Sequence, residues 1–538
     1  MPIRQTPFSK EVPVNVVGGS TFGRYKYISA EKTYNMFVSD GWLVNTAGYK
    51  RVYELLASGS GRGIFKSVRG NFILVVVNAT VYRLDENLSP TLIGILNSTS
   101  GEVFIDENLA NQICIVDGVD AYIYNHSLAP NLTVQTLNAS LIPNYVTYHD
   151  TFFLFGNANP TSVGAKWYAY KYNTDTTITE QSELALQTKP DYAVAIKRIP
   201  GQGNNVLVFG TTVCEVHTHV GGLENYLRNP TISVDYGCLS VSTIASSDHY
   251  IAWLGVNESN APVIMVYSGQ GAQEISTDGI NYLLAQLVHP DRSTAMFYRQ
   301  DGHLFYQLTF YASEDNLTLI YDFNTQQFFN LSDGHLNYHP ARDVVYFNHK
   351  SYFISLNNAS LYEMSTDYTT YDENINTNDP ALAQEIQRIR ICGNIREPNS
   401  ARFIANSLML TIEQGYDPRF TGLSYQSNNA IITEVTLDDV VSESGSPLVV
   451  EGATASSASE LPVQYTSSTV YRPRVDLSIS YDGGVTFGTT VSNYMRQVGN
   501  RKNVMSWQKM GAANDLTLKF RFWGTSRFVV NNAQLQVY

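Results

Sequence analysis

Charged residues are scarce in this sequence: they make up 15% of the 538 residues, against 43% hydrophobic residues. Long apolar runs are missing too, because the longest, FILVVV at 72–77, is typical of a buried strand and far too short to cross a membrane. The amino-terminal stretch MPIRQTPFSKEVPVNV lacks the apolar core of a secretion signal. We therefore expect a globular protein with no membrane anchor.

Cysteine is rare as well. The chain has four cysteines, Cys114, Cys214, Cys238 and Cys392, which are scattered and stand in apolar, strand-like surroundings. This pattern favours reduced thiols in the core over the alternatives of disulfides or metal ligands. We expect a protein made in a reducing cytoplasm, without a metal site.

Positive charge is in deficit. Lys and Arg number 35 against 48 Asp and Glu, which gives a net charge of −13. An acidic surface binds nucleic acid and anionic membranes poorly. A protein that grips either by charge is therefore not expected.

Catalytic motifs are also missing, since the sequence has no His-Glu-x-x-His, Gly-x-Ser-x-Gly or Cys-x-x-Cys. The glycine-rich stretches at 59–63, 201–205 and 268–273 lack the Lys-Ser/Thr of a phosphate-binding loop and are interpreted as turns. His217 and His219 could begin a metal site, but no third ligand stands nearby, which favours solvated strand histidines. We expect no catalytic residues, no cofactor and no metal, and hence no enzyme.

What the sequence does have is aromatic residues, at 12%, with 36 Tyr and 24 Phe, and these favour strands. From about residue 60 to 366 a pattern of short alternating strands and Gly, Asn or Asp turns keeps returning, for example at 64–88 and 102–125. The repeats start about 40 to 50 residues apart, which is the blade spacing of a β-propeller, here with about six or seven blades. The segment 43–55 could supply a closing strand to the last blade. The alternative is an irregular series of β-sandwiches.

The repeat stops at the polar stretch 367–380. We expect four regions: an amino-terminal arm and closing strand over 1–56, the propeller over 57–366, a linker over 367–384 and a β-sandwich over 385–538. The sequence PALAQEIQ allows one or two helical turns, with Asp379 as N-cap and Pro380 at the first helical position. A Ser-, Ala- and Gly-rich insertion near 437–468 is interpreted as a mobile loop. The fold class is thus all-β throughout.

One short motif in the second domain has the spacing of the Asp-box of sialidase-type propellers, Ser-x-Asp-x-Gly-x-Thr-aromatic. Its residues are Ser480, Asp482, Gly484, Thr486 and Phe487. Asp-Gly between VDLSI and VTFGTTV is a strong hairpin signal, so the motif is interpreted as a structural hairpin. A sialidase-like glycosidase would also need three arginines, a Tyr-Glu pair and an acid spread over the blades. Arginines are few in the repeats and the box lies outside them, which disfavours that alternative.

The segment 18–55, GGSTFGRYKYISAEKTYNMFVSDGWLVNTAGYKRVYEL, resembles the amino-terminal signature of the packaged-DNA stabilisation proteins, the tail hub or nozzle proteins of short-tailed bacteriophages. The residues that match the signature are Arg24, Ser29, Ala30, Thr33, Asn35 and Phe37, followed by Thr46, Ala47, Gly48 and Tyr49. Ala47 stands where the family usually has Pro, and Asn35-Met36-Phe37 replaces its Asn-hydrophobic-Tyr-Pro. The likeness continues more loosely along nearly the whole chain.

The resemblance implies a structural virion protein, assembled in the cytoplasm of the host bacterium. It implies a homo-hexameric ring below the head-to-tail adaptor and portal that extends and closes the DNA channel. Further partners would be a tail needle or plug and tail fibres or spikes, with DNA passing through without tight binding. A receptor- or glycan-binding tail protein is the alternative.

Overall fold

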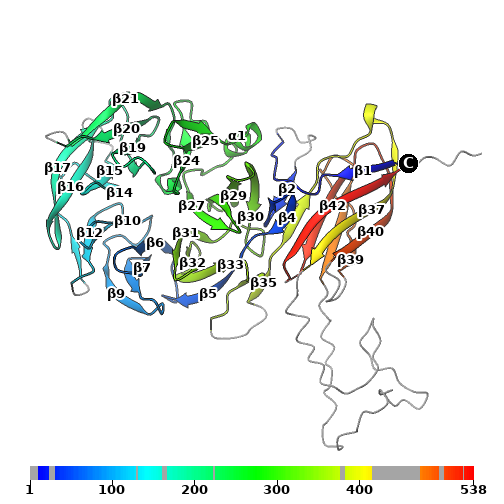
Figure 1. Ribbon diagram of the computed structural model, residues 1–538, viewed down its shortest axis with the longest axis horizontal. Coiled ribbons are helices and arrows are strands. Elements are labelled where there is room, and N and C mark those ends of the chain that lie inside the picture. Colours follow the sequence, from blue (N-terminus) through cyan, green and yellow to red (C-terminus); the bar gives the residue numbers. More distant parts are fainter. Residues whose placement is uncertain are drawn as a thin grey trace, which may run out of the picture.

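The chain is built almost wholly of β-strands. The computed structural model describes residues 10–23, 31–128, 131–159, 166–221, 225–375, 382–414, 473–495, 502–524 and 526–538. Across these ranges α1 (Asp278–Leu284) is the only α-helix, and none is long and apolar enough to cross a membrane. A ring of radiating sheets forms one end of the elongated molecule and a layered domain forms the other (Figure 1).

In the described residues seven antiparallel sheets form the ring, which confirms the predicted β-propeller; the series of sandwiches was wrong. We number the blades in chain order, and each of blades 1 to 4 and 6 consists of consecutive strands.

Blade 1 consists of β6 (Gly61–Ser67), β7 (Phe72–Val77), β8 (Thr80–Leu84) and β9 (Pro90–Ile95). Blade 2 consists of β10 (Phe104–Glu107), β11 (Gln112–Val116), β12 (Ala121–Asn125) and β13 (Leu132–Val134). Blade 3 consists of β14 (Pro143–His149), β15 (Phe152–Asn157), β16 (Lys166–Thr174) and β17 (Thr177–Ala185). Blade 4 consists of β18 (Ala195–Arg198), β19 (Asn205–Phe209), β20 (Cys214–His219) and β21 (Tyr226–Val234).

Blade 5 consists of β22 (Gly237–Cys238), β23 (Ala245–Ser246), β24 (Ile251–Val256), β25 (Pro262–Tyr267) and β26 (Ala272–Glu274). Blade 6 consists of β27 (Ser293–Gln300), β28 (His303–Phe310), β29 (Leu317–Asp322) and β30 (Gln327–Leu331). Blade 7 consists of β31 (Ala341–Phe347), β32 (Lys350–Ser355), β33 (Ser360–Ser365) and β5 (Gly48–Glu54).

Blade 7 closes the ring with a strand from the beginning of the chain. β5 pairs antiparallel with β33, from Gly48 opposite Ser365 to Glu54 opposite Ser360. A ring of blades is closed when its last blade contains strands from both ends of the repeat region. The closure therefore depends on a contact between segments about as far apart as the propeller allows.

The core of the propeller lies between neighbouring blades. In β7 every residue is buried, and successive side chains point to opposite faces of the sheet. Phe72, Leu74 and Val76 pack towards blade 2, whereas Ile73, Val75 and Val77 pack towards blade 7. This explains why the central strands of the blades are apolar throughout instead of alternating.

The second domain is a β-sandwich of two sheets. The strands are β1 (Lys10–Val14), β3 (Met36–Ser39), β4 (Trp42–Asn45), β37 (Phe403–Gln414), β40 (Lys502–Ala513) and β42 (Phe528–Val537) in one sheet, and β36 (Arg388–Ile391), β38 (Arg474–Ser480), β39 (Val491–Tyr494) and β41 (Thr517–Trp523) in the other. The amino-terminal segment thus contributes three strands to this domain. Val14, Met36 and Leu43 pack in one core with the carboxy-terminal strands.

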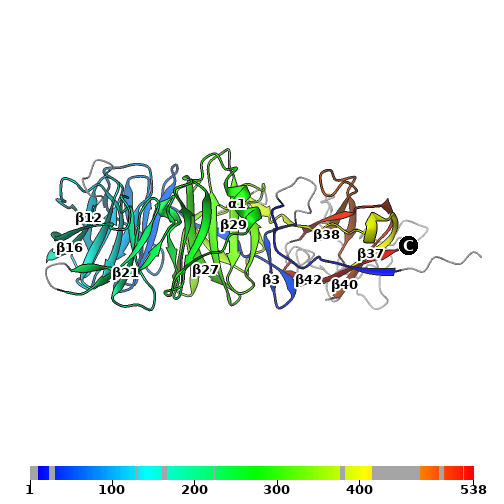
Figure 2. The ribbon, with the colours of Figure 1, turned by 90° about the horizontal axis from the view of Figure 1, so that it is seen from above.

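The two domains share a sheet. β2 (Lys32–Tyr34) pairs in parallel with β30 of blade 6 and antiparallel with β36 of the sandwich. Blade 6, β2 and one sandwich sheet therefore form a single nine-stranded sheet. Seen from above, the propeller and the sandwich lie in line along the molecule (Figure 2).

The region after the propeller differs from the sequence interpretation. The stretch 367–384, expected to be a linker, contains β34 (Thr370–Asp372), which pairs with β5, and the start of β35 (Ala383–Glu385). The helical turns expected in PALAQEIQ are wrong for 383–385, which form a strand. Asp379, Pro380 and the insertion near 437–468 lie outside the described residues.

Candidate functional site

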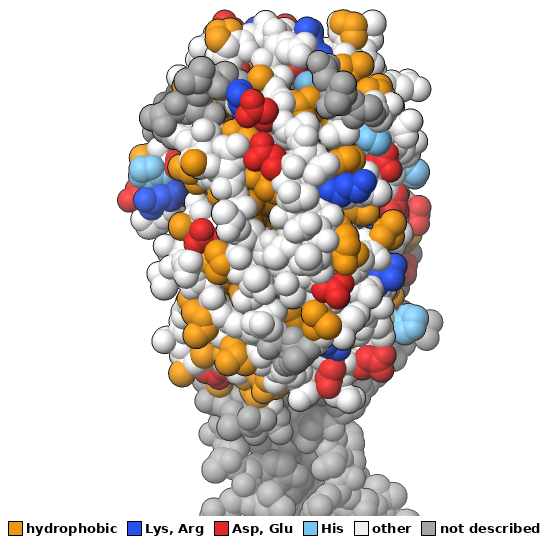
Figure 3. Space-filling view, turned by 90° about the vertical axis from the view of Figure 1, so that its left-hand side faces the viewer, with side chains coloured by type: hydrophobic (Ala, Val, Ile, Leu, Met, Phe, Trp, Pro, Cys, Tyr) orange, Lys and Arg blue, Asp and Glu red, His pale blue; other side chains and the backbone are white. Residues whose placement is uncertain are grey.

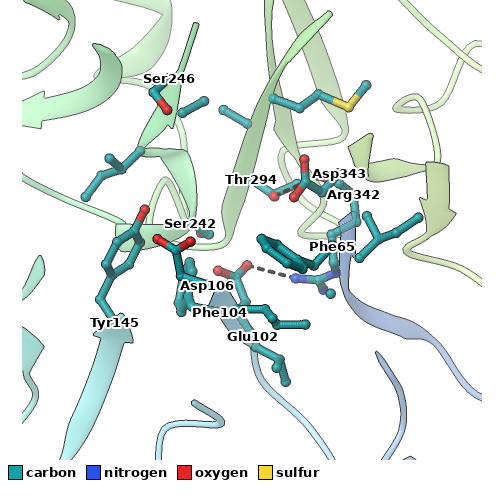
Figure 4. Close-up of a pocket in the computed structure, with 18 of the residues that line it drawn as sticks. Phe65, Glu102, Phe104, Asp106, Tyr145, Ser242, Ser246, Thr294, Arg342 and Asp343 are labelled. Atoms are coloured by element: carbon teal, nitrogen blue, oxygen red, sulfur yellow. Dashed lines mark hydrogen bonds and ion pairs between the residues drawn. The ribbon is translucent and has the colours of Figure 1, made fainter. Parts of the chain in front are cut away.

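The innermost strands of all seven blades surround a central cavity of about 380 Å³ (Figure 4). Each blade contributes backbone or side chains from its first strand or from the turn before it. Five basic residues line the cavity, namely Arg62, Lys66, Lys197, Arg198 and Arg342. Three acidic residues line it as well, namely Glu102, Asp106 and Asp343. A cavity with more basic than acidic groups is unexpected in a chain whose net charge is −13.

Some of these charges are neutralised within the protein. Arg62 donates hydrogen bonds to carbonyls of the neighbouring turns, including Gly101 O and Ser98 O at 2.8 Å. Arg342 Nη1 lies 2.9 Å from Glu102 Oε1, which joins blade 7 to the start of blade 2. The Arg62 contacts hold the turns between blades 1 and 2, and the Arg342–Glu102 pair links blade 7 to blade 2 past blade 1.

The carboxyl groups of the cavity are partly desolvated. Burial raises the pKa of Asp343 to about 6, against the weaker effect of a hydrogen bond from the Val344 amide. Burial also raises the pKa of Glu102, while its partner Arg342 lowers it. Asp343 therefore changes charge in the mildly acidic range, where an exposed aspartate stays ionised.

The cavity does not have the arrangement that a sialidase-like enzyme needs. Three unengaged arginines would have to clamp a substrate carboxylate. Of the three arginines that line the cavity, Arg62 is bound to backbone carbonyls and Arg342 is paired with Glu102. In the part of the chain that the structure describes, no group of three or more His, Cys, Asp or Glu could hold a metal ion.

The Asp-box lies in the sandwich, at the connection between β38 and β39, which pair antiparallel. Ser480 Oγ donates to Asp482 Oδ1 at 2.6 Å and accepts from the Gly484 amide at 2.8 Å. Thr486 donates to Asp482 through its hydroxyl at 2.6 Å and through its amide at 2.9 Å. These bonds to the charged form lower the pKa of Asp482, first of all the bond from Ser480. The strand that the sequence suggested in VTFGTTV begins later, at Val491.

Every bond of the Asp-box is internal to the turn, so we expect Asp482→Ala to loosen this hairpin and leave the propeller intact. Limited proteolysis should cut the variant first in the carboxy-terminal domain, while the propeller fragment survives as in the parent. Asp85→Ala is a matched control, because Asp85 also accepts two turn amides, but in blade 1. Equal protection of parent and Asp482→Ala would contradict the structural role.

The interpretation of His217 as a solvated strand histidine is wrong. Its side chain is not solvated: it is 1% exposed, and its Nε2 lies 3.1 Å from Oε2 of Glu215, which is fully buried. His219 is partly exposed and pairs with Asp150. The two histidines therefore have separate partners, and each belongs to the packing of blade 4. The four cysteines are buried and free, as the sequence predicted.

The signature residues that the structure describes meet at the junction of the domains. Asn35 Nδ2 donates to Ser332 Oγ and to the Gln387 carbonyl, both at 2.8 Å, and its Oδ1 accepts from the Ser332 amide at 2.9 Å. Ser332 follows blade 6 and Gln387 precedes β36, so one buried amide joins the propeller to the sandwich. Asn35 has φ 56°, a left-handed conformation that Asn tolerates better than most residues.

Thr33 takes part in the same junction through Arg390, which is fully buried. Arg390 Nη1 donates to Thr33 Oγ1 at 3.0 Å and to the Gly19 carbonyl at 2.9 Å, and Nη2 bonds Glu31. This guanidinium holds the amino-terminal segment against the sandwich. Arginine fits because its planar fork can serve several acceptors at once.

Gly48 is required by close packing at the closing strand. A Cβ atom at this position would lie 2.5 Å from the carbonyl oxygens of Tyr368 and Thr370. Any side chain would push β34 away from β5. Three signature residues, Arg24, Ser29 and Ala30, lie outside the described residues.

The site therefore defines a class: a structural protein whose propeller is closed by its own amino-terminal strand and joined through one sheet to a β-sandwich. The sequence model for the β-propeller of bacteriophage P22 Gp10 matches residues 30–369, and the model for the β-sandwich of the same protein matches residues 445–538. The chain belongs to this family of phage tail hub, or packaged-DNA stabilisation, proteins. It is a structural protein of the phage tail and hence a component of the virion.

No curated protein matches the sequence. Solved propellers match the fold at low identity. A streptogramin B lyase is 12% identical over 60% of this chain and 98% of its own, with a TM-score of 0.39. A virginiamycin B lyase from Staphylococcus aureus is 11% identical over 59% and 99%, with a TM-score of 0.41, and the Pan2 WD40 domain of Neurospora crassa is 9% identical over 57% and 89%, with a TM-score of 0.37. These likenesses are too weak to bear on the fold or the function of this chain.

Proposed function

We propose that the protein forms a homo-hexameric ring below the portal and the head-to-tail adaptor. The ring extends and closes the DNA channel, retains the packaged DNA, and anchors a needle or plug together with fibres or spikes. Membership of the phage tail hub family supports this role. The proposal adds the copy number, the neighbours and the channel to the established role as a tail component.

The observation that carries the proposal is the nine-stranded sheet that runs from blade 6 through β2 into the sandwich. A subunit of a closed ring must hold its contact surfaces at one fixed angle. Two domains on a flexible linker would not do so, whereas a shared sheet and a buried Asn35 resist hinge motion. The subunit is thus suited to serve as a rigid wedge.

The DNA would pass between subunits and not through a propeller. The propeller cavity, at about 380 Å³, has the size of a small-molecule site and cannot admit a duplex. On the end of the propeller away from the sandwich, Lys and Arg are scattered among Asp and Glu and form no block (Figure 3). A ring of such subunits would surround DNA with few attractive contacts.

Electron microscopy of the full chain mixed with portal–adaptor particles tests the ring. We expect six copies in a closed ring directly below the adaptor, with the sixfold arrangement formed on the template. A single copy per tail, or attachment only at the tip of a fibre, would overturn the proposal. Binding of host surface glycans by the isolated chain, without ring formation, would instead favour the receptor-binding alternative.

We expect the isolated protein not to bind duplex DNA measurably at near-physiological salt, because each phosphate contact by Lys or Arg adds affinity and the chain carries a net charge of −13. Fluorescence anisotropy with a labelled non-specific duplex measures this. Binding tighter than about 10⁻⁶ M, the tight end of ordinary non-specific affinity, would show a DNA-gripping surface. A control titration at low salt shows that the labelled duplex reports binding when it occurs.

A further inference from the structure

We propose that the central cavity of the propeller is a binding site for a small, doubly charged oxyanion of the phosphate or sulfate type. The cavity is separate from the junction and from the surfaces of the proposed ring. The inference concerns the isolated chain and does not depend on ring formation.

Lys197 is the first cationic group of the cavity that a bound anion would stabilise. Its ammonium donates to the Tyr145 hydroxyl at 3.1 Å and forms no ion pair with a carboxylate among the described residues. An ammonium has three N–H donors, so two remain for a ligand. An amine this deep between blades loses much of its hydration, and an anion would compensate for that loss.

Arg342 is the second cationic group of the cavity that a bound anion would stabilise. Its side chain is 9% exposed, and its Nε has no hydrogen-bond partner in the described part of the chain. Nη1 is taken by Glu102, so one edge of the guanidinium remains available. Figure 4 shows Arg342 and Tyr145 on opposite sides of the cavity, with Glu102 and Asp106 between them. Lys66 and Arg198, which also line the cavity, have no partner in the described residues.

The acidic groups that face the cavity are Asp106, Glu102 and Asp343, and two of them are already engaged. Asp106 accepts from the Tyr148 amide at 2.7 Å and from the Thr147 hydroxyl at 3.2 Å. Glu102 is paired with Arg342. Asp343 accepts a hydrogen bond from the Val344 amide, and when ionised its charge also acts on Lys197 and Arg342, which weakens their attraction for an anion. The lining as a whole therefore carries five cationic side chains against three carboxylates.

The cavity volume of about 380 Å³ lies near the lower end of the range for small-molecule sites. A tetrahedral oxyanion with a few waters fits it, and an arginine and a lysine are the usual partners of such an anion. Because Asp343 loses its charge as pH falls through about 6, the repulsion disappears and the affinity for the anion rises.

Isothermal titration of the full chain with sulfate tests the site, since sulfate keeps its charge as the pH changes. We expect saturable binding with one site per chain, stronger at about pH 5 than at about pH 7.5, and weakened at least about tenfold in Lys197→Met. Asp343→Asn should bind at neutral pH as tightly as the parent does at acidic pH. Lys509→Met is the control, because Lys509 is an exposed lysine of the sandwich and should change nothing.

Titrations with other ligands distinguish the sources of the anion. At about pH 7.5, where it is mostly doubly charged, inorganic phosphate should bind like sulfate, and acetate at matched ionic strength should bind more weakly. A dinucleotide with a 5′-phosphate should compete with sulfate only if the cavity admits the end of a nucleic acid. Absence of saturable sulfate binding, or equal weakening by Lys197→Met and Lys509→Met, would overturn the proposal. Unchanged thermal melting of Lys197→Met shows that a loss of binding is not a loss of fold.

Discussion

Replacing Trp253 with Ala is expected to lower the free energy of unfolding by about 3–5 kcal/mol, as in other large-to-small changes in a core. Trp253 is fully buried in β24, where its ring meets Phe209 edge to face at 5.3 Å between centroids. Its indole N–H donates to the Gly237 carbonyl at 3.0 Å. The substitution therefore leaves both a cavity and an unpaired carbonyl between blades 4 and 5.

Tyr346→Ala serves as the matched control for this change. Tyr346 is 59% exposed on β31 of blade 7, so its loss should cost less than about 0.5 kcal/mol. Thermal or denaturant unfolding of both variants gives the comparison. Equal stability of Trp253→Ala and Tyr346→Ala would mean that the core between these blades is not where the structure places it.

Replacing Asn35 with Ala is expected to cost at least as much, about 3–8 kcal/mol, for a different reason. The change leaves the buried groups of Ser332 and the Gln387 carbonyl without partners, at about 1–3 kcal/mol each. It also puts an alanine at φ 56°, which costs about 1–2 kcal/mol more. Because Asn35 joins the domains, we expect the single unfolding transition to separate into two.

Two variants isolate these contributions. Asn35→Gly keeps the left-handed backbone favourable and removes only the side-chain bonds. Asn260→Ala removes an exposed Asn at φ 54° that has no side-chain bond in the described residues, and so measures the backbone cost alone. If Asn35→Ala and Asn260→Ala were equally stable, Asn35 would not join the domains.

Much of the propeller could be predicted from the sequence, because each blade is made by contacts between neighbouring strands. The short apolar run of β7 and the turns between strands are local signals, and they indicated the repeat without any knowledge of its partners. The closing role of the segment that contains Gly48 was also suggested, since one strand was left over before the first repeat. Local pairing is what a single sequence reports best.

The β-sandwich after the propeller was predicted and is confirmed, but the strands that the amino-terminal segment adds to it, and the cavity, could not be predicted in the same way. β1 pairs with the last strand of the chain, Lys10 opposite Val537, and no local pattern indicates such a partner. The basic residues of the cavity stand in different blades, and only the closed ring brings Lys197 near Arg342. A weak signal was present, since the first strand of a repeat carries charged residues in AIKRIP and ARDVVY. Without the ring these resemble ordinary surface positions.

The pairing of the amino-terminal segment with late parts of the chain also determines when the protein can fold during its synthesis. β5 has no partner until β33 has been made, and β1 has none until β42 emerges at residues 528–537. At about 5–20 residues per second, synthesis takes roughly half a minute to two minutes, and during that time the first strands remain unpaired. The propeller can therefore close only after β33 has been made, and the sandwich only after β42 has been made. A product that ends before β42 would therefore leave β1 without its partner and expose open strand edges in the sandwich.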